Sequence, residues 1–119
     1  MIRYTFSLPP STNHLFANIP GKGRVKTAAY RDWIEAAGYE ILAQGRQKIR
    51  GKVSIAILAS RPDRRKRDCS NLIKPLEDIL TRMAVIEDDS FVERLSVQWT
   101  DTGEGIIVIV QPAEMGMAA

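Results

Sequence analysis

The chain has 119 residues, 45% of them hydrophobic and 26% charged, with a formal net charge of +3. This length favours one domain with its own core, and the composition excludes a disordered or membrane-embedded protein. The lone Cys69 excludes an internal disulfide, and no apolar run is long enough to cross a bilayer, so we expect a cytoplasmic protein that does not contact membranes.

The N-terminal half predicts a strand, a loop and a helix. Residues 2–8 alternate apolar and polar side chains, which predicts a strand. Residues 9–24 are rich in turn formers and have no period, which predicts a long loop of functional interest. Apolar residues at steps of three and four then predict an amphipathic helix from Thr27, the expected N-cap, to about Lys48, with Gly45 near its end.

The next two elements are a strand and a second helix. Residues 52–60 are apolar on both faces, which predicts a central strand of the sheet. A basic loop at 61–67 leads into a helix over about residues 71–83. Pro75 must lie in its first turn, because proline lacks the N–H that a helix interior requires.

The C-terminal part predicts two further strands. Residues 92–99 and 106–110 are separated by a glycine-containing turn, and we expect them to pair as an antiparallel hairpin. The order β-α-β-α-β-β then indicates an α/β protein of the α+β type, in which two main helices pack on a mixed sheet. We expect a single domain over residues 1–119.

Positive charge is concentrated in two segments. One contains Lys22, Arg24 and Lys26, and the other is the basic loop at 61–67. Two basic segments on a nearly neutral body are the electrostatic pattern that phosphate backbones select. Taken alone, however, a run of charge is more often a solvated surface loop.

Carboxylates flank the second helix. Asp68 directly follows the basic loop, and Glu87, Asp88 and Asp89 follow the helix. If the two groups meet in space, they offer the hard oxygen ligands that Mg²⁺ prefers, and the ion would activate water for attack on a phosphodiester. Lys74 would then stabilise the charge of the transition state.

Structural explanations of the same residues stay open. Asp68, Ser70 or Asn71 are suitable caps for the second helix. Lys74 and Asp78 stand four residues apart, as a surface ion pair does. The acidic run after the helix is also compatible with an ordinary turn.

The pattern Arg67-Asp68-x-x-Asn71-Leu72-x-Lys74, followed by Asp78 and by VIEDD ending at Asp89, resembles the RusA family of Holliday junction resolvases. These are small phage- and prophage-borne endonucleases. The segments LPPSTNHLF and VKTAAYRDW are similar to the family's PPS-x-N loop and to the start of its first helix. The resemblance therefore covers most of the chain.

This resemblance implies a Mg²⁺-dependent homodimer, with Mn²⁺ as an alternative ion, that cuts branched four-way DNA by paired nicks in recombination and repair. Asp68 and Asp89 match the family's metal-binding aspartates, and Lys74 matches the lysine required for cleavage. Arg67 and Asn71 match residues of the DNA-facing site. The further DNA-binding candidates are Arg64, Arg65, Lys66 and Asn13.

One position departs from the family pattern. Ser70 stands where a second aspartate is usual, and a neutral hydroxyl binds Mg²⁺ less well than a carboxylate. Ser70 itself, through a metal-bound water, and Asp88 are further candidate ligands, and Asp78 is another nearby acid. Two functions stay open: an active junction endonuclease, and a structure-selective DNA-binding protein whose catalysis is weakened by Ser70. A small-molecule enzyme or a plain interaction domain ranks last.

Overall fold

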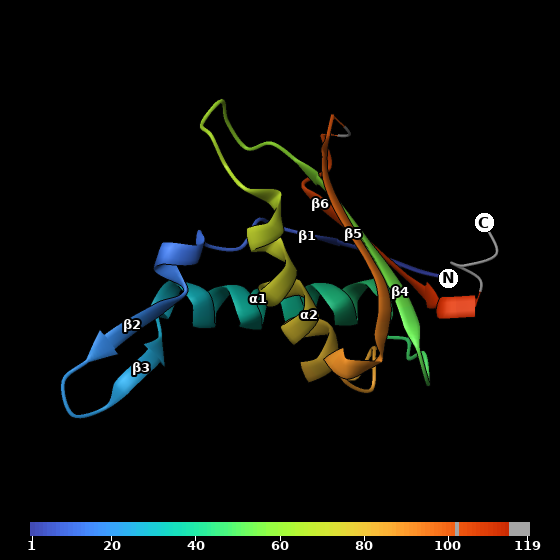
Figure 1. The fold of residues 1–119 in the computed structure, drawn as a ribbon, viewed down its shortest axis with the longest axis horizontal. Coiled ribbons are helices and arrows are strands. Elements are labelled where there is room, and N and C mark those ends of the chain that lie inside the picture. Colours follow the sequence, from blue (N-terminus) through green and yellow to red (C-terminus); the bar gives the residue numbers. More distant parts are fainter. Residues whose placement is uncertain (102, 115–119) are drawn as a thin grey trace.

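A computed structural model describes residues 1–101 and 103–114. Both main helices cover the same face of a four-stranded sheet, and a small hairpin projects beside them (Figure 1). The architecture is the expected single α+β domain with a mixed sheet. In chain order the elements are β1 (Ile2–Phe6), η1 (Thr12–His14), β2 (Phe16–Ile19), β3 (Gly23–Lys26), α1 (Ala28–Gln44), β4 (Val53–Ser60), η2 (Cys69–Leu72), α2 (Ile73–Arg82), η3 (Asp89–Phe91), β5 (Val92–Thr100) and β6 (Ile106–Pro112).

The strand order in the main sheet is β1-β6-β4-β5. Strand β4 is central, as predicted, and it pairs in parallel with β5 and antiparallel with β6. The predicted β5–β6 hairpin is therefore wrong, because β4 lies between the two strands. Pairing on both sides satisfies the backbone of the most apolar strand and buries it, which outweighs the short sequence separation of β5 and β6.

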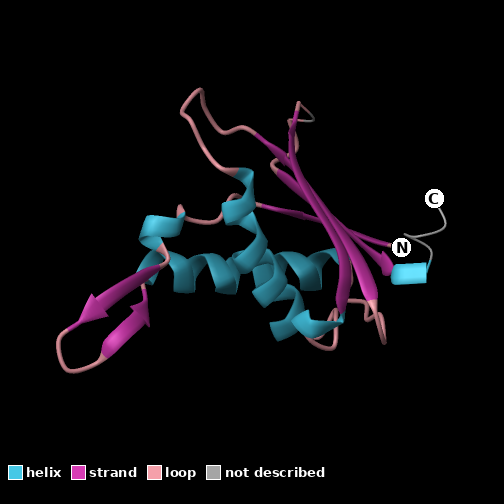
Figure 2. Cartoon of the chain, in the orientation of Figure 1, coloured by secondary structure: helices cyan, strands magenta, loops and turns pink. Residues whose placement is uncertain are grey.

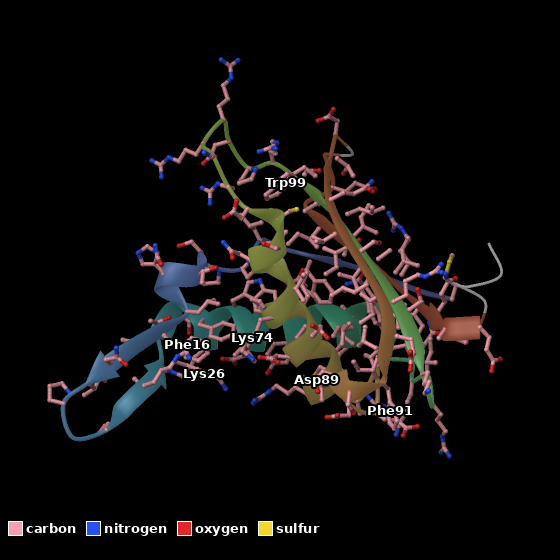
Figure 3. All side chains as sticks on the ribbon, in the orientation of Figure 1. Phe16, Lys26, Lys74, Asp89, Phe91 and Trp99 are labelled. Carbon is pink, nitrogen blue, oxygen red and sulfur yellow. The ribbon has the colours of Figure 1, made fainter. Side chains whose placement is uncertain are left out.

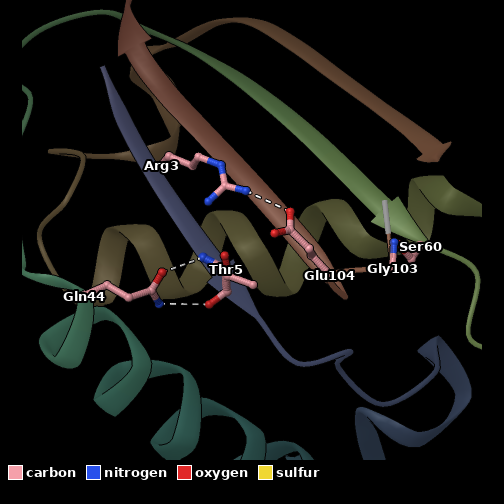
Figure 4. Close-up of polar contacts among 6 residues, drawn as sticks. All are labelled: Arg3, Thr5, Gln44, Ser60, Gly103 and Glu104. Atoms are coloured by element: carbon pink, nitrogen blue, oxygen red, sulfur yellow. Dashed lines mark hydrogen bonds and ion pairs between the residues drawn. The ribbon is translucent and has the colours of Figure 1, made fainter. Parts of the chain in front are cut away.

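The connection from β5 to β6 passes the end of β4 at Ser60. The Ser60 hydroxyl accepts a hydrogen bond from the Gly103 amide at 2.9 Å, and the Ser60 amide donates to the Gly105 carbonyl at 2.8 Å. Figure 4 shows the Gly103 contact beside the ion pair of Arg3 and Glu104. These contacts hold the turn against the end of β4 instead of closing a hairpin.

The core lies between the sheet and the helices. The helix-facing residues of β4 are at most 1% exposed, and each such aliphatic side chain contributes about 1.5–3 kcal/mol by its burial. Trp33, Ala37 and Ile41 of α1 and Leu76, Ile79 and Leu80 of α2 belong to the same cluster.

Helix α1 begins where the sequence predicted but ends four residues earlier than Lys48. The Thr27 side chain caps it by accepting a hydrogen bond from the Tyr30 amide at 3.1 Å. The last helical residue is Gln44, because Gly45 takes a φ of 91°, which glycine adopts without strain. At the C-terminal end of α1, the Gln44 side chain accepts from the Thr5 amide at 2.8 Å and covers the edge of β1 (Figure 4).

Helix α2 starts with the 3₁₀ turn η2 and carries Pro75 in its first turn, as the missing N–H requires. It ends in a Schellman motif, in which the Val85 amide donates to the Leu80 carbonyl at 2.9 Å and the Ala84 amide to the Thr81 carbonyl at 3.0 Å. Ala84 has a φ of 55° there, unusual for a residue other than glycine.

The predicted loop over residues 9–24 is wrong in its second half. Strands β2 and β3 form a hairpin that extends away from the body (Figure 2). Its turn relies on Gly21 and Gly23, with φ of 80° and 75°, and on a hydrogen bond from the Lys22 amide to the Ile19 carbonyl at 3.0 Å. Each strand has only four residues, too few for a clear alternation in the sequence.

Candidate nucleic-acid interface

The basic loop is organised by an acid within it. The Asp63 carboxylate accepts from Nε of Arg67 at 3.1 Å and from its Nη2 at 2.9 Å, and from the Arg65 amide at 3.0 Å. The guanidinium of Arg67 thereby lowers the pKa of Asp63 from 3.8 to about 2. The loop thus has a defined conformation, with Arg67 held in place.

The other predicted cations of the loop are available to a ligand. Arg64, Arg65 and Lys66 are exposed, and their side chains form no hydrogen bond or ion pair with any described residue. Nitrogen-tipped side chains extend from this loop away from the body of the protein (Figure 3). Such side chains can contact phosphates without first breaking an internal contact.

Five predicted site residues line one cleft of about 470 Å³, and they come from two separate segments of the chain. They are Asn13 of η1, Lys66 and Arg67 of the basic loop, Asp68, and Asn71 of η2. Trp99 of β5 also lines this cleft, and the guanidinium of Arg61 lies 5.0 Å from its ring centroid. The structure therefore brings these predicted residues together and adds Trp99 to them.

Capping does not explain the polar residues before α2. Asp68 is the N-cap residue of η2 but its side chain makes no capping hydrogen bond, and Leu72 holds the equivalent position for α2. The side chains of Ser70 and Asn71 likewise lack hydrogen-bond partners in the part of the chain described. The capping explanation is wrong for these residues, and the exposed carboxylate of Asp68 is open to a ligand.

Lys74 lies in a second, smaller cleft of about 160 Å³ beside Ser70 and Asn71. Its Nζ is 3.1 Å from Oδ2 of Asp78, so the predicted surface ion pair exists. The Lys74 side chain is 64% exposed, and so open a pair contributes little stability, about 0–1 kcal/mol. Lys74 can therefore exchange this partner for a phosphate at small cost.

Asp88 and Asp89 line a third cleft, of about 280 Å³, together with Asp78, Lys26 and Arg82. The Asp88 carboxylate accepts hydrogen bonds from the Ser90 hydroxyl and amide, which lower its pKa and cap η3. Nearby, partial burial and the charges of Asp89 and Asp78 raise the pKa of Glu77. Negative charge thus accumulates around the C-terminal half of α2.

Asp68 and Asp89 lie at opposite ends of α2. The helix has 10 residues and is about 15 Å long at 1.5 Å per residue. Figure 3 shows Asp89 beside one end and Trp99, which shares the cleft of Asp68, beyond the other. Across the described residues, no group of three or more His, Cys, Asp or Glu side chains is arranged to hold a metal ion. One chain does not bring the two predicted metal ligands together.

The β2–β3 hairpin contributes residues that line two of these clefts, whereas the sequence predicted a loop for most of this segment. Phe16 and Arg24 line the cleft of Lys74, and Lys26 lines the cleft of Asp89. The signal that could have found the hairpin was Pro20-Gly21 between two short runs, FANI and RVK. Because these runs have only three or four residues, the turn signal was not enough to predict a hairpin instead of a loop.

One α+β scaffold carries a basic loop, a lysine at a helix start and, at Asp68, a carboxylate that has no hydrogen-bond or ion-pair partner among residues 1–101 and 103–114. Together these features define a protein suited to act on a polyanion. The family model for endodeoxyribonuclease RusA matches residues 7–111. The chain is also 29% identical over 112 residues to the crossover junction endodeoxyribonuclease RusA of Aquifex aeolicus (strain VF5), which covers 92% of this chain and 89% of that relative. The chain belongs to the RusA family of endodeoxyribonucleases, as the motif around Asp68 predicted. No helix in residues 1–101 and 103–114 is long and apolar enough to cross a membrane.

Proposed function

We propose that this protein is a homodimeric endonuclease that resolves four-way DNA junctions by paired nicks, in recombination and repair, and that it requires Mg²⁺ or Mn²⁺. The observation that carries the proposal is the cleft in which Asp68, whose carboxylate has no hydrogen-bond or ion-pair partner among the described residues, lies beside Lys66, Arg67, Asn13 and Asn71. A carboxylate set among cations is suited to hold a metal ion next to a bound phosphate.

The basic loop is the main DNA-binding element of the proposal. Arg64, Arg65 and Lys66 contact backbone phosphates, and Arg67, held by Asp63, presents its remaining donors to the cleft. Asn13 and Asn71 offer amide groups in the same cleft as Asp68. Contacts of this kind do not read sequence, which is appropriate for a protein that recognises the shape of a junction. Binding should therefore weaken steeply with salt.

Asp68 and Asp89 are the proposed ligands of the divalent ion, with Ser70 and Asp88 as further candidates. Their oxygen atoms are the donor type that Mg²⁺ and Mn²⁺ accept, and Mg²⁺ commonly takes only one or two carboxylates besides water and phosphate. A bound ion would polarise the scissile phosphate and acidify a water. Lys74, whose ion pair with Asp78 is partly exposed, offsets the negative charge that develops on the phosphate.

The separation of the two aspartates supports a homodimer. Because they lie at opposite ends of α2, we propose that each metal site takes Asp68 from one copy and Asp89 from the other. A two-fold dimer then has two equivalent sites, which suits a substrate with two equivalent strands to cut. The absence of a complete metal group in the described part of one chain supports this arrangement.

Mixed dimers of Asp68→Asn and Asp89→Asn chains test the shared site. Each homodimer should bind a synthetic four-way junction and fail to nick it. A heterodimer, isolated through two different tags, should regain nicking at one strand, because one of its two sites then has both aspartates. If the heterodimer stays inactive while the wild-type mixture cleaves, the ligands do not come from different copies. Circular dichroism of each variant controls for folding.

The alternative function is a junction-binding protein with weakened catalysis, and Ser70 favours it. Its hydroxyl lies in the cleft of Lys74, where a carboxylate would add a metal ligand. Ser70→Asp should then raise nicking and lower the Mg²⁺ concentration needed for half-maximal rate. Ser70→Asn serves as the control, because asparagine has nearly the shape of aspartate but no charge. Equal rates in the wild type and Ser70→Asp would exclude the weakened-catalysis reading.

A further inference from the structure

One face of the β2–β3 hairpin carries an aromatic ring, an amide and two cations. The register pairs Phe16 with Lys26 and Asn18 with Arg24, so these four side chains point to the same side. That side is turned to α2, since Phe16 and Arg24 line the cleft that contains Lys74. Figure 3 shows Phe16, Lys26 and Lys74 close together where the hairpin meets α2.

The three clefts follow one another along α2. The cleft of Asp68 and the cleft of Lys74 share Thr12 and Asn71. The cleft of Asp89 is lined by Asp78, the ion-pair partner of Lys74, and by Lys26. We call this succession the α2 groove. In the clefts of Lys74 and Asp89, α2 forms one wall. The other wall is formed by Phe16 and Arg24 of the hairpin in the first of these clefts, and by Lys26 with Tyr30 and Ile34 of α1 in the second.

We propose that the α2 groove holds one strand of the DNA substrate and that Arg24 and Lys26 of the hairpin contact its phosphates. This inference rests on the proposed function and adds a second DNA-binding element to the basic loop. Arg24 and Lys26 stand two residues apart on the same face of β3, so they present two cations about 6–7 Å apart along the groove.

The hairpin cations are free to bind an anion. Neither side chain forms an ion pair or a hydrogen bond with the residues that the structure describes. The Arg24 guanidinium lies 3.9 Å from the centroid of the Phe16 ring. This stacking fixes the plane of the guanidinium and leaves its N–H donors unused, an arrangement that suits a phosphate.

The base of the hairpin is firmly joined to α1. The Thr27 hydroxyl donates to the His14 carbonyl at 2.6 Å, and Arg31 donates to the Lys26 carbonyl at 2.7 Å. The rings of Phe16 and Tyr30 pack edge to face at 5.7 Å. Arg24 and Lys26 are therefore positioned before DNA arrives, which reduces the entropy lost on binding.

The charge of the α2 groove favours a DNA strand as its occupant. Besides Arg24 and Lys26, the groove is lined by Lys66, Arg67, Lys74 and Arg82. Carboxylates oppose this charge mainly toward the two ends, at Asp68 and at Asp88 and Asp89, where the proposed shared metal ions would bind. A polyanionic strand matches the cations of such a surface, and the second copy of the proposed dimer reaches the groove through its acidic ligands at these metal sites.

The test compares Arg24→Gln/Lys26→Gln with Lys48→Gln/Arg50→Gln, a control that removes two exposed cations after α1. Affinity for a fluorescent four-way junction is measured without divalent ions from 50 to 200 mM salt. We expect the hairpin variant to bind about tenfold more weakly or worse, and its slope of log affinity against log salt to fall by about 1.8, the value for two lost phosphate contacts. The control should change neither quantity.

Two results would overturn the inference while the wild type binds the junction. One is equal affinity and equal salt slope for the hairpin variant and the control. The other is dissociation of the hairpin variant to monomers in sedimentation, which would assign the hairpin to a protomer interface. If the wild type fails to bind the junction, the proposed function falls and this inference falls with it.

Discussion

Asp63 holds Arg67 through both carboxylate oxygens, at 3.1 Å to Nε and 2.9 Å to Nη2. Both residues lie inside the basic loop, and Arg67 directly precedes the proposed metal ligand Asp68. A loop with so much positive charge would otherwise repel itself. The acid among the bases therefore sets the shape of the loop and the direction in which Arg67 points.

The first prediction concerns the pH range over which this loop keeps its shape. The folded pKa of Asp63, about 2, is below its ordinary value of 3.8. The contribution of the pair is thus fully present above pH 3.8 and is lost as the pH falls through 2. NMR titration of the Asp63 carboxyl carbon should give a midpoint near 2 in the wild type and a clearly higher midpoint in Arg67→Gln, which keeps only the contribution of Arg65. A wild-type midpoint near 3.8 would show that the pair does not form in solution.

The second prediction separates Lys74 from its partner Asp78. Lys74→Met should lower the rate of junction nicking by about 10²–10³-fold, the loss typical of removing one group that stabilises transition-state charge. Junction affinity should change much less in Lys74→Met. The stability of the protein is a separate matter: Asp78→Asn should alter the free energy of unfolding by less than about 1 kcal/mol, because the ion pair is exposed. Single-turnover kinetics with saturating enzyme measures the first effect, and equal rates for Lys74→Met and the wild type would remove Lys74 from catalysis.

The third prediction concerns the end of α2. Ala84 adopts a φ of 55° in the Schellman motif, a conformation that costs an L-residue about 1–2 kcal/mol and glycine almost nothing. Ala84→Gly should therefore stabilise the protein by about 0.5–1 kcal/mol, after the greater entropy of glycine in the unfolded chain is subtracted. Urea denaturation checks this, and Ala36→Gly, at an exposed helical position, should instead destabilise.

The fourth prediction uses two glycines in the turn before β6. Both have positive φ, 73° at Gly103 and 74° at Gly105, but only at Gly105 would a Cβ meet another atom, the Phe6 carbonyl oxygen at 2.9 Å. Gly103→Ala should cost about 1–2 kcal/mol from backbone strain alone. Gly105→Ala should cost clearly more, because β1 must also move. Equal unfolding free energies for the two variants would contradict the contact.

The sequence by itself determined the features that depend on neighbouring residues. Thr27 as a cap, Gly45 as a stop and Pro75 in a first turn each follow from local backbone chemistry. The two apolar faces of residues 52–60 were enough to predict a central strand. The motif from Arg67 to Lys74 indicated the family, because its residues are consecutive on one loop and one helix start.

Only the tertiary structure decided which distant residues are neighbours. Local patterns fix backbone dihedrals and a buried face, but the partner of a strand depends on which pairing buries the most apolar surface. Strand β4 accordingly separates β5 from β6, although a turn joins them in sequence. The same long-range packing places Asp68 and Asp89 at opposite ends of α2. It also puts Arg24 of the hairpin in the same cleft as Lys74. No spacing along the chain encodes these distances, because each depends on how the helix and the hairpin pack against the rest of the fold.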